Sequence, residues 1–468
     1  MSSAPLQVLL LNPPGTRVYI RDYYCSKVSK SNYLFHPVDL LMLSGVLAER
    51  YHLQVIDAIA DRLSPHDCLE KIAILQPAIV ISLIGSVSLD EDLPFLEQVA
   101  SQGRRVLVTG DACRERPAEW LNAHPYIEAV ISDFTSTDIS DYLDGGLNGH
   151  GVIMRGSTNA CWHSGEPARE FQLSPQHHLF TSHGYRFPFV RHHQFATVLT
   201  DYGCPYPCSF CIVATLEYRY RPPDNIIEEL RHLKRLGKRE LFFANQTFGI
   251  DRPLTMELCR RMSTEGFGFG WVCFSRVDLV DAALLEAMKA AGCHTIIFGV
   301  ESASEEILQS YRKGYTKQQI RAAFRLARQH GIRTVATFIL GLPEENEETA
   351  GETITFLKQL DCDFVSFNVA VPRAGTDMRQ QAVEAGLISR DTCMMDQSGS
   401  SIAMPSRYLT RKRIYELRNK AVRDFYLRPA YLWRRLTAVR SIYELREQLY
   451  EGMILLRDVL RGNDANPD

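Results

Sequence analysis

The stretch Asp201-Tyr-Gly-Cys204-Pro-Tyr-Pro-Cys208-Ser-Phe-Cys211 places three cysteines within eight residues. One loop with this C-x₃-C-x₂-C spacing can turn three thiolates toward one metal centre, and its two prolines stiffen it. A structural zinc site normally closes with four ligands, and no fourth Cys or His follows at short spacing. Three thiolates suit a cubane iron–sulfur cluster, in which one iron would have no protein ligand. Three buried cysteines, or zinc closed by a distant His, are the alternatives.

The cysteine loop follows the first strand of a βα series that runs from Phe195 to about Met378. Six repeats are too few for an eightfold barrel, so the series predicts an open, partial (β/α)₆ barrel. The expected strands are 196–200, 240–244, 270–274, 295–299, 334–340 and 364–369, with helices near 226–235, 254–265, 282–291, 305–309, 316–330 and 347–359.

Over about residues 196–378 the chain resembles the radical S-adenosylmethionine (SAM) enzymes. The resemblance implies that Cys204, Cys208 and Cys211 bind a 4Fe-4S cluster whose fourth iron chelates SAM. It implies that an electron from a donor such as flavodoxin or ferredoxin cleaves SAM to a 5′-deoxyadenosyl radical. Phe210 matches the aromatic residue that packs near the adenine in that family.

Further matches lie at predicted strand ends, where barrel active sites are found. Arg276 is similar to the SAM-carboxylate partner of the family, a task that suits a bidentate guanidinium. Glu301 is similar to a residue that accepts hydrogen bonds from SAM, and Ile339 and Gly341 fall in a segment like the adenine motif. Taken singly, Arg276 or Glu301 would be a surface ion-pair member. Their order after the cysteine loop favours the SAM site.

Two positions depart from the family pattern. The adenine motif usually begins with Gly, whereas this chain has Thr337. Near the second strand, where the family often has Gly-Gly-Glu or paired acidic residues that hold the SAM amino group, this chain has Asn245-Gln246-Thr247-Phe248-Gly249. Asn245 or Gln246 could supply a side-chain carbonyl instead.

The first 145 residues alternate β-rich runs with helices and predict a Rossmann-like parallel sheet of five strands. Ligands on such sheets sit at the carboxyl ends of strands. That rule points to Asn12, Asp57, 84–86, 110–113 and 132–134. The expected strands are 6–11, 53–56, 78–83, 105–109 and 127–131, with helices at 37–50, from Pro65, and at 90–100.

An α/β unit of this kind ahead of a radical SAM barrel is similar to the cobalamin-binding branch of the family. The resemblance implies cobalamin at the strand ends, with Asn12, Pro13, Ser86 and Gly110 as contacts. The Asp-x-His-x-x-Gly signature is absent from this sequence, so an axial histidine is not expected. A scaffold that binds no corrin is the alternative. The loop 19–30 could reach the site, with its Cys25 as a thiol or cobalt ligand, or could be a solvated loop.

The predicted domains are 1–145, cobalamin-binding-like; 146–194, a linker; 195–380, the partial barrel; and 381–468, a helical region. Between Arg407 and Arg461 lie fourteen Arg and Lys but six Asp and Glu, a net charge of +8. This region predicts a helical cap with a charged outer face, or a basic surface for an anionic substrate or lipid headgroups at a peripheral membrane contact. No nucleic-acid-binding motif accompanies the charge.

Composition sets the remaining limits. The 468 residues carry 52 basic and 55 acidic side chains, so no whole-chain field exists to hold a polyanion. No apolar run approaches the roughly 20 residues that span a bilayer, and the start lacks a cationic signal-peptide region, which predicts a cytoplasmic protein.

We therefore expect a radical SAM enzyme that moves a methyl group from methylcobalamin to an unactivated carbon of a small-molecule or lipid substrate. One alternative is a radical cyclisation or rearrangement without methyl transfer, with or without cobalamin. The other is a non-catalytic iron–sulfur or zinc protein. The sequence selects no substrate and no oligomeric state.

Overall fold

The computed structural model describes residues 6–23, 26–30, 33–114, 116–146, 151–156, 169–393, 396–399, 401–439 and 442–461. Tyr24 and Cys25, and with Cys25 the predicted thiol, lie outside the described residues. The chain forms two compact units. The first comprises Met1–Arg186, Leu216–Glu229 and Cys393–Met395, and the second comprises Phe187–Thr215, Leu230–Thr392 and Asp396–Asp468.

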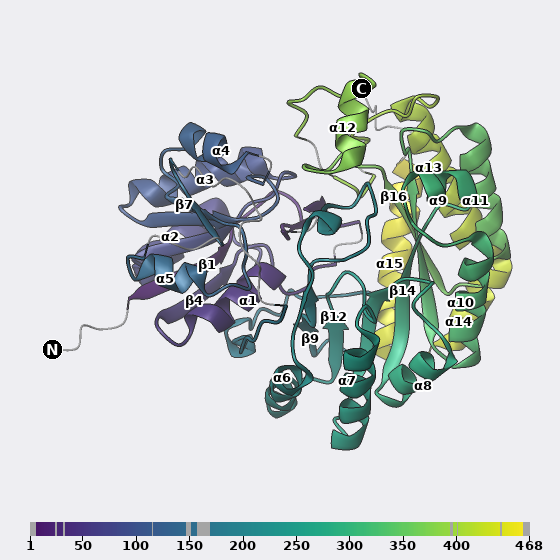
Figure 1. The fold of residues 1–468 in the computed structure, drawn as a ribbon, viewed down its shortest axis with the longest axis horizontal. Coiled ribbons are helices and arrows are strands. Elements are labelled where there is room, and N and C mark those ends of the chain that lie inside the picture. The colour runs from purple at the N-terminus through teal and green to yellow at the C-terminus, as the bar shows by residue number, and fades with distance from the viewer. Residues whose placement is uncertain are drawn as a thin grey trace. The chain divides into compact units, whose positions relative to one another are not determined.

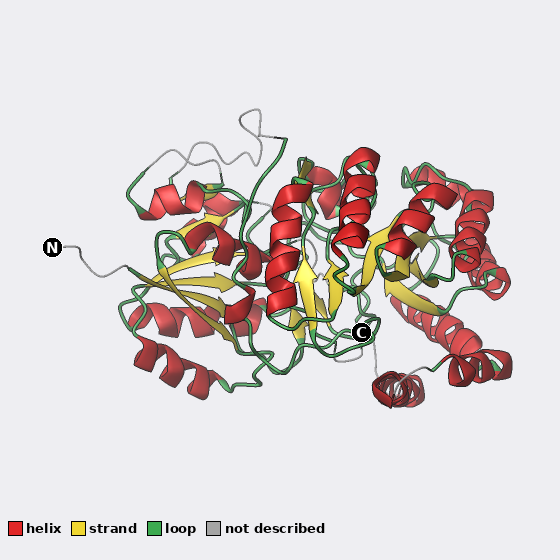
Figure 2. Cartoon of the chain, turned by 90° about the horizontal axis from the view of Figure 1, so that it is seen from below, coloured by secondary structure: helices red, strands yellow, loops and turns green. Residues whose placement is uncertain are grey.

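The first unit is built on a six-stranded sheet in the order β4-β1-β5-β6-β7-β8 (Figure 1). Helices lie on both faces of this sheet (Figure 2). Fully buried strands such as β5 need near-continuous apolar sequence, which is the pattern of a covered parallel sheet. The strands are β1 (Gln7–Asn12), β4 (His52–Asp57), β5 (Ile79–Leu83), β6 (Arg105–Thr109), β7 (Ala129–Ile131) and β8 (Val152–Met154), and the helices are α1 (Val38–Leu47), α2 (Pro65–Leu75), α3 (Leu89–Ser101), α4 (Pro117–Ala123) and α5 (Asp138–Leu143).

The sixth strand corrects the predicted count of five. β8 pairs antiparallel with β7 and lies inside the segment predicted to be a linker. Three residues are too few to show a two-residue hydrophobic period, so pairing with β7, rather than local sequence, establishes the strand. The first unit also contains a small hairpin of β2 (Tyr19–Ile20) and β3 (Lys27–Val28) and a 3₁₀ turn, η1 (His177–Leu179).

The second unit contains a six-stranded, wholly parallel sheet in the order β16-β15-β14-β13-β12-β9. Helices cover its outer face (Figure 1). In the described part of the chain β9 and β16 are the two edges, so the barrel is open and partial, and the predicted fold class is confirmed. The sheet and its helices are β9 (Phe195–Val198), β12 (Glu240–Phe243), α7 (Arg252–Glu265), β13 (Gly270–Ser275), α8 (Ala282–Ala290), β14 (Cys293–Glu301), α9 (Glu305–Ser310), α10 (Lys317–Gln329), β15 (Arg333–Leu340), α11 (Glu347–Gln359) and β16 (Phe364–Val369). A two-residue strand, β10 (Asp201–Tyr202), and a 3₁₀ turn, η2 (Ile212–Thr215), follow β9 in the chain, and α6 (Pro223–Arg235), whose residues up to Glu229 belong to the first unit, precedes β12.

The sequence caps these helices locally. Asp251 and Asp281 accept backbone N–H groups at the starts of α7 and α8, and Thr316 and Asn346 form capping boxes for α10 and α11. Fixed helix starts hold each strand end in place, and the strand ends carry the candidate site.

The carboxyl-terminal part is less helical than predicted. It contains α12 (Asp377–Glu384), α13 (Arg411–Tyr426), α14 (Pro429–Ala438) and α15 (Ile442–Arg461). The described residues between α12 and α13 form no helix. Gly386 and Gly399 have positive φ there, which interrupts helical backbone. In the described residues no helix combines the length and apolarity needed to cross a membrane.

Candidate functional site

The three clustered cysteines lie on the loop that follows β9. The loop turns tightly, because the backbone N–H of Cys211 donates to the carbonyl of Cys208 at 3.0 Å. It is anchored through Ser209, whose N–H donates to Tyr311 and whose carbonyl accepts from Met378. None of the three forms a disulfide. The candidate ligands therefore sit on a braced loop.

The thiols lie close enough to affect one another. Burial, with smaller contributions from the neighbouring Cys208 and Cys204, raises the pKa of Cys211 to about 12. Among the described residues no three His, Cys, Asp or Glu side chains gather round one metal-ion position. That arrangement differs from a mononuclear site and is compatible with a cluster that binds each thiolate at a different iron. The donor set fits a 4Fe-4S cluster.

Arg276, immediately after β13, lies against this loop. Its Nη1 is 3.7 Å from the sulfur of Cys208, and its guanidinium carbon is 3.9 Å from the centre of the Tyr206 ring. Nε and Nη2 bind the two carboxylate oxygens of Asp278 at 3.0 and 2.9 Å, and Nη2 also donates to the carbonyl of Lys313. The structure thus brings Arg276 to the cluster loop, oriented by Asp278.

Glu301 ends β14 in a left-handed conformation, with φ of 63°, after a register shift between Gly299 and Glu301. A non-glycine residue is held at positive φ only when its surroundings impose it, and such residues cluster at functional sites. The Glu301 carboxylate accepts from Lys313 at 3.1 Å, and both side chains are largely buried. The ammonium of Lys313 is 5.5 Å from the Phe210 ring.

Phe210 and Ile339 come together although 129 positions separate them in the chain. Both are partly buried and pack against one apolar cluster that includes Tyr311, Leu342 and Met378. Gly341 follows β15 with φ of 83°, and a Cβ on it would lie 2.9 Å from Ile414. Two of the predicted adenine residues, Phe210 on the cysteine loop and Ile339 at the end of β15, therefore pack against one apolar cluster.

Asn245, a predicted replacement for the amino-group contact, is hydrogen-bonded to a buried carboxyl group. Its Nδ2 donates to Asp201 at 3.1 Å, and both side chains are buried. Burial raises the pKa of Asp201 to about 8, against hydrogen bonds from Thr200 and Asn245 that lower it. Gln246, the other predicted replacement, is half-buried.

Sequence reasoning missed Lys313, Asp278 and Asp201 as parts of this site. Asp201 and Asp278 lie in segments that contain the predicted cluster and SAM residues. A carboxylate two residues after Arg276 could have indicated an ion pair between the two side chains. Lys313 lies in a loop after α9, and no local pattern singles it out.

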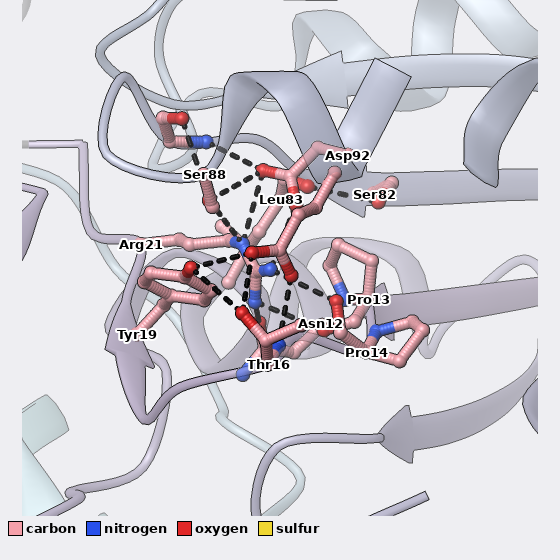
Figure 3. A network of polar contacts seen from close by, with 12 residues as sticks. Asn12, Pro13, Pro14, Thr16, Tyr19, Arg21, Ser82, Leu83, Ser88 and Asp92 are labelled. Carbon is pink, nitrogen blue, oxygen red and sulfur yellow. Dashed lines mark hydrogen bonds and ion pairs between the residues drawn. The ribbon is translucent and has the colours of Figure 1, made fainter. Parts of the chain in front are cut away.

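In the first unit, the carboxyl edge of the sheet holds a buried polar network, shown in Figure 3. Arg21 binds both carboxylate oxygens of Asp92 at 3.0 and 2.7 Å, and both side chains are fully buried. Its remaining donors reach Asn12 Oδ1 and the carbonyls of Pro13 and Pro14. This clamp fixes the loop after β1.

Both polar atoms of the Asn12 side chain have partners inside the protein, since Nδ2 donates to Asp57 at 2.8 Å and Oδ1 accepts from Arg21 at 3.0 Å. Asp57 also accepts from the backbone of Ala60 and from the Tyr185 hydroxyl, while burial raises its pKa to about 6. The side chains of Asn12 and Asp57 therefore form hydrogen bonds within the protein at the carboxyl edge of the sheet.

Ser86 is half-buried, and its N–H and hydroxyl both donate to Asp111, which also accepts from Ser26. Gly110 has φ of 144°, and a Cβ on it would lie 1.9 Å from the Ile84 carbonyl oxygen. Gly110 therefore allows close packing of backbone at this edge. Asn12, Asp57, Ser86 and Asp111 supply polar groups there rather than a metal-binding imidazole.

Some known proteins resemble only part of this chain, and others resemble nearly all of it. Residues 198–357 match the radical SAM superfamily. An uncharacterized methyltransferase of Pyrococcus horikoshii is 28% identical over 445 residues, 91% of this chain and 93% of that protein. A bacteriochlorophyllide d C-12(1)-methyltransferase of Chlorobaculum tepidum is 31% identical over 194 residues, 40% of this chain and 42% of that protein. An anaerobic magnesium-protoporphyrin IX monomethyl ester cyclase of Rubrivivax gelatinosus is 30% identical over 184 residues, 38% and 33% of the two chains.

Solved structures share the fold of the whole chain. The methyltransferase TsrM of Kitasatospora setae, in a structure with cobalamin and a 4Fe-4S cluster, superposes with a TM-score of 0.67 at 17% identity and covers 99% of this chain and all of that one. The cobalamin-dependent enzyme OxsB superposes with a TM-score of 0.66 at 15% identity, and the match covers 99% of this chain and 73% of that one. Residues 198–357 therefore form a radical SAM domain, a kind of domain that implies a 4Fe-4S cluster and SAM, and the three cysteines lie on the loop after its first strand.

Proposed function

We propose that this protein is a cobalamin-dependent radical SAM methyltransferase that acts on an unactivated carbon of a small molecule. The observation that carries the proposal is the extent of the likeness to TsrM, which includes the amino-terminal sheet as well as the barrel. The relative from Pyrococcus horikoshii, named a methyltransferase, spans the same two parts. The proposed domains keep the predicted boundaries 1–145, 146–194, 195–380 and 381–468.

In this proposal Cys204, Cys208 and Cys211 hold the cluster. Phe210, Ile339 and Gly341 bind the adenine of SAM, Arg276 binds its carboxylate, and Glu301 accepts hydrogen bonds from it. Asn12, Pro13, Ser86 and Gly110 form the cobalamin edge. The bound cofactors supply hydrogen abstraction and a methyl group; the protein binds and orients them.

The charges of the second unit support this assignment. Asp278 binds Nε and Nη2 of Arg276, which holds the guanidinium plane with Nη1 directed toward Cys208 of the cysteine loop. Lys313 and Glu301 neutralise each other, which allows both to stay buried beside Phe210 without a net charge. The charged side chains of the proposed SAM site are thus held in place by contacts within the protein.

The test is product analysis on anaerobic protein from cobalamin-supplied cells. Methyl transfer consumes two SAM molecules and yields S-adenosylhomocysteine together with 5′-deoxyadenosine. About four irons and one cobalt per chain are expected, with the iron lost in a Cys204/Cys208/Cys211→Ala triple variant and kept in Cys393→Ala. Iron without cobalt, or 5′-deoxyadenosine without S-adenosylhomocysteine, contradicts the methyl-transfer proposal.

A second candidate, radical ring closure without methyl transfer, is favoured by the likeness to the Rubrivivax gelatinosus cyclase, although the match covers a third of that protein. The same assay separates the two, because ring closure releases no S-adenosylhomocysteine.

We further propose that a flavodoxin or ferredoxin supplies the electron and that the protein acts in the cytoplasm, where thiols stay reduced. The carboxyl-terminal helices also present exposed Trp433, Leu436 and Leu449 in the segment with net charge +8, which suits a peripheral contact with anionic lipid headgroups. Cosedimentation with phosphatidylglycerol vesicles tests this, and a Trp433→Ser/Leu436→Ser variant should stay in the supernatant.

A further inference from the structure

Arg435, on α14, has a buried guanidinium group whose donors are unpaired. The residue is 6% exposed, and among the described residues its Nε, Nη1 and Nη2 atoms have no hydrogen-bond partner. A carboxylate oxygen of Asp363 lies 3.7 Å from Nη1, which is beyond hydrogen-bond distance. Buried donors that stay unpaired cost free energy, and a guanidinium carries five of them. Arg435 therefore has the donors to bind an acceptor from outside the chain.

The ring of Phe364 covers one face of this guanidinium. The ring centre lies 4.3 Å from the guanidinium carbon, which is a cation–π contact. Such a contact uses the flat face of the group, whereas the N–H donors point outward in its plane. Phe364 therefore holds Arg435 in place and leaves its donors available.

Neighbouring elements add further unpaired donors. Arg333, the first residue of β15, binds Glu444 of α15 through Nη1, but its buried Nε has no partner in the described part of the chain. The same holds for the buried amide nitrogen of Gln448, which lies about one turn after Glu444 on α15. We call Arg333, Arg435 and Gln448 the donor cluster. Its unpaired buried atoms are all donors.

Charge also favours an anion beside Arg435. Burial lowers the pKa of Arg435, and the positive charge of Arg333 lowers it as well, while Tyr431, Asp363 and Glu444 oppose the change. Both carboxylates have other partners, because Glu444 binds Arg333 and Asp363 accepts the N–H of Thr334 at 3.0 Å. An anion between the two guanidinium groups would offset their repulsion and pair their donors.

The donor cluster lies at the amino ends of the barrel strands. Arg333 begins β15 and Phe364 begins β16 of a parallel sheet, whereas the cysteine loop follows the carboxyl end of β9. Active sites of β/α barrels lie at the carboxyl ends, so a ligand here is not the substrate of the radical reaction. The adjacent Asp363 and Arg434 have side-chain exposures of 29% and 33%, so solvent reaches the border of the cluster.

We propose that the donor cluster binds a phosphate group, carried by a soluble phosphate compound or by a lipid headgroup. Its donors come from α14, β15 and α15, which suits an anion with oxygens in several directions better than a planar carboxylate. Trp433 and Leu436, which flank Arg435 on α14, are exposed and would contact the apolar part of a lipid. This inference is independent of the proposed methyl transfer.

A competing arrangement needs no ligand. A small movement of Asp363 would bring its Oδ1 within hydrogen-bond distance of Arg435 and form an internal ion pair. The variant Asp363→Asn separates the two arrangements. If phosphate binds, loss of this negative charge strengthens phosphate binding. An internal pair instead predicts a lower melting temperature for Asp363→Asn and no phosphate binding to the unaltered protein, and that result overturns the inference.

The first test measures the binding of inorganic phosphate to the anaerobic holoenzyme by isothermal titration calorimetry. The buffer contains no other phosphate or sulfate, and potassium chloride keeps the ionic strength constant. We expect saturable binding, weakened by about tenfold or more in Arg435→Gln, because charge-assisted hydrogen bonds are lost. Arg413→Gln is the matched control, since it removes the same charge from an exposed residue that pairs with Glu347 and Glu416. It should leave phosphate binding unchanged.

A second variant covers the case in which Arg435→Gln does not fold or loses its iron. Arg435→Lys keeps the buried positive charge but cannot form two parallel hydrogen bonds. We expect weaker phosphate binding in this variant as well, with a smaller loss than in Arg435→Gln. Equal phosphate affinity in Arg435→Lys and the unaltered protein would contradict the role of the guanidinium.

Cosedimentation with phosphatidylglycerol vesicles identifies the source of the phosphate group. A headgroup site predicts that Arg435→Gln binds vesicles less than Arg413→Gln does and that inorganic phosphate competes with the vesicles. A site for a soluble compound predicts that the two variants bind vesicles equally and differ in phosphate affinity. If they differ in neither measurement, the inference is overturned. Iron content and SAM binding report on the proposed function separately.

Discussion

The guanidinium of Arg276 lies 3.7 Å from the sulfur of Cys208, although 68 positions separate them in the chain. The contact joins the third barrel strand to the cysteine loop. Because Asp278 holds the other edge of the guanidinium in a bidentate pair, Arg276 has one orientation available. The relationship places a fixed positive charge beside a predicted iron ligand.

Replacing Arg276 by Lys should weaken SAM binding at least about tenfold while the protein keeps its iron, because a point charge cannot hold Asp278 bidentately and also serve a carboxylate. Anaerobic dialysis and iron analysis measure the two effects. Arg105→Lys alters an exposed bidentate pair with Glu128 and should change neither. Unaltered SAM affinity in Arg276→Lys would rule out the carboxylate role.

Replacing Arg21 by Met should destabilise the first unit by ~3–5 kcal/mol, since it leaves Asp92 buried and unpaired. Burial raises the pKa of Asp92 and Arg21 opposes that rise, so the lone carboxyl would take up a proton. Urea unfolding followed by circular dichroism measures the loss.

Arg50→Met removes an exposed pair with Asp144 and should have little effect. The double variant Arg21→Met/Asp92→Leu should recover part of the loss. A single variant as stable as Arg50→Met would show that the Arg21 clamp does not hold the loop after β1.

Gly110→Ala should destabilise the first unit more than Gly103→Ala does. Both glycines have positive φ, so each change carries a backbone cost of ~1–2 kcal/mol. At Gly103 the added methyl meets nothing within 4 Å, whereas at Gly110 it meets the Ile84 carbonyl oxygen. Thermal unfolding of cobalamin-free protein measures the difference, and equal melting temperatures would contradict it.

Stability should fall with rising pH because of Glu345. Its side chain is fully buried, accepts from the Gly341 N–H, and has a pKa that burial raises to about 8. The folded state then binds a proton more tightly than the unfolded chain, whose Glu pKa is about 4.3, so stability is lost between about pH 4 and pH 8 and changes no further above that.

Glu345→Gln should flatten this dependence and gain stability relative to the unaltered protein as pH rises. Melting temperatures at pH 5, 6, 7 and 8.5 measure it. Glu347→Gln is the control, because the pKa of that exposed carboxyl is lowered by Arg413 and its effect has the opposite sign. Parallel curves for Glu345→Gln and the unaltered protein would contradict the assignment.

Much of the fold could be predicted because its determinants are local. The strand Phe364–Val369 and the helix Glu347–Gln359 have the predicted bounds, since apolar runs and capping residues mark them in the sequence. β8 could not be predicted, because a three-residue edge strand depends on its partner. The irregular stretch after α12 lies in the region predicted to be helical, and the positive φ values of Gly386 and Gly399 interrupt helical backbone there.

For the candidate site, the sequence determined the chemistry: three thiols at C-x₃-C-x₂-C spacing, on a loop after a strand, and a series of polar residues at later strand ends. Only the tertiary structure decided their partners. It joined Arg276 to Cys208, Glu301 to Lys313, and Asp201 to Asn245. The reason is geometric: the carboxyl ends of parallel strands converge, so residues far apart in sequence meet there, while spacing along the chain records only local contacts.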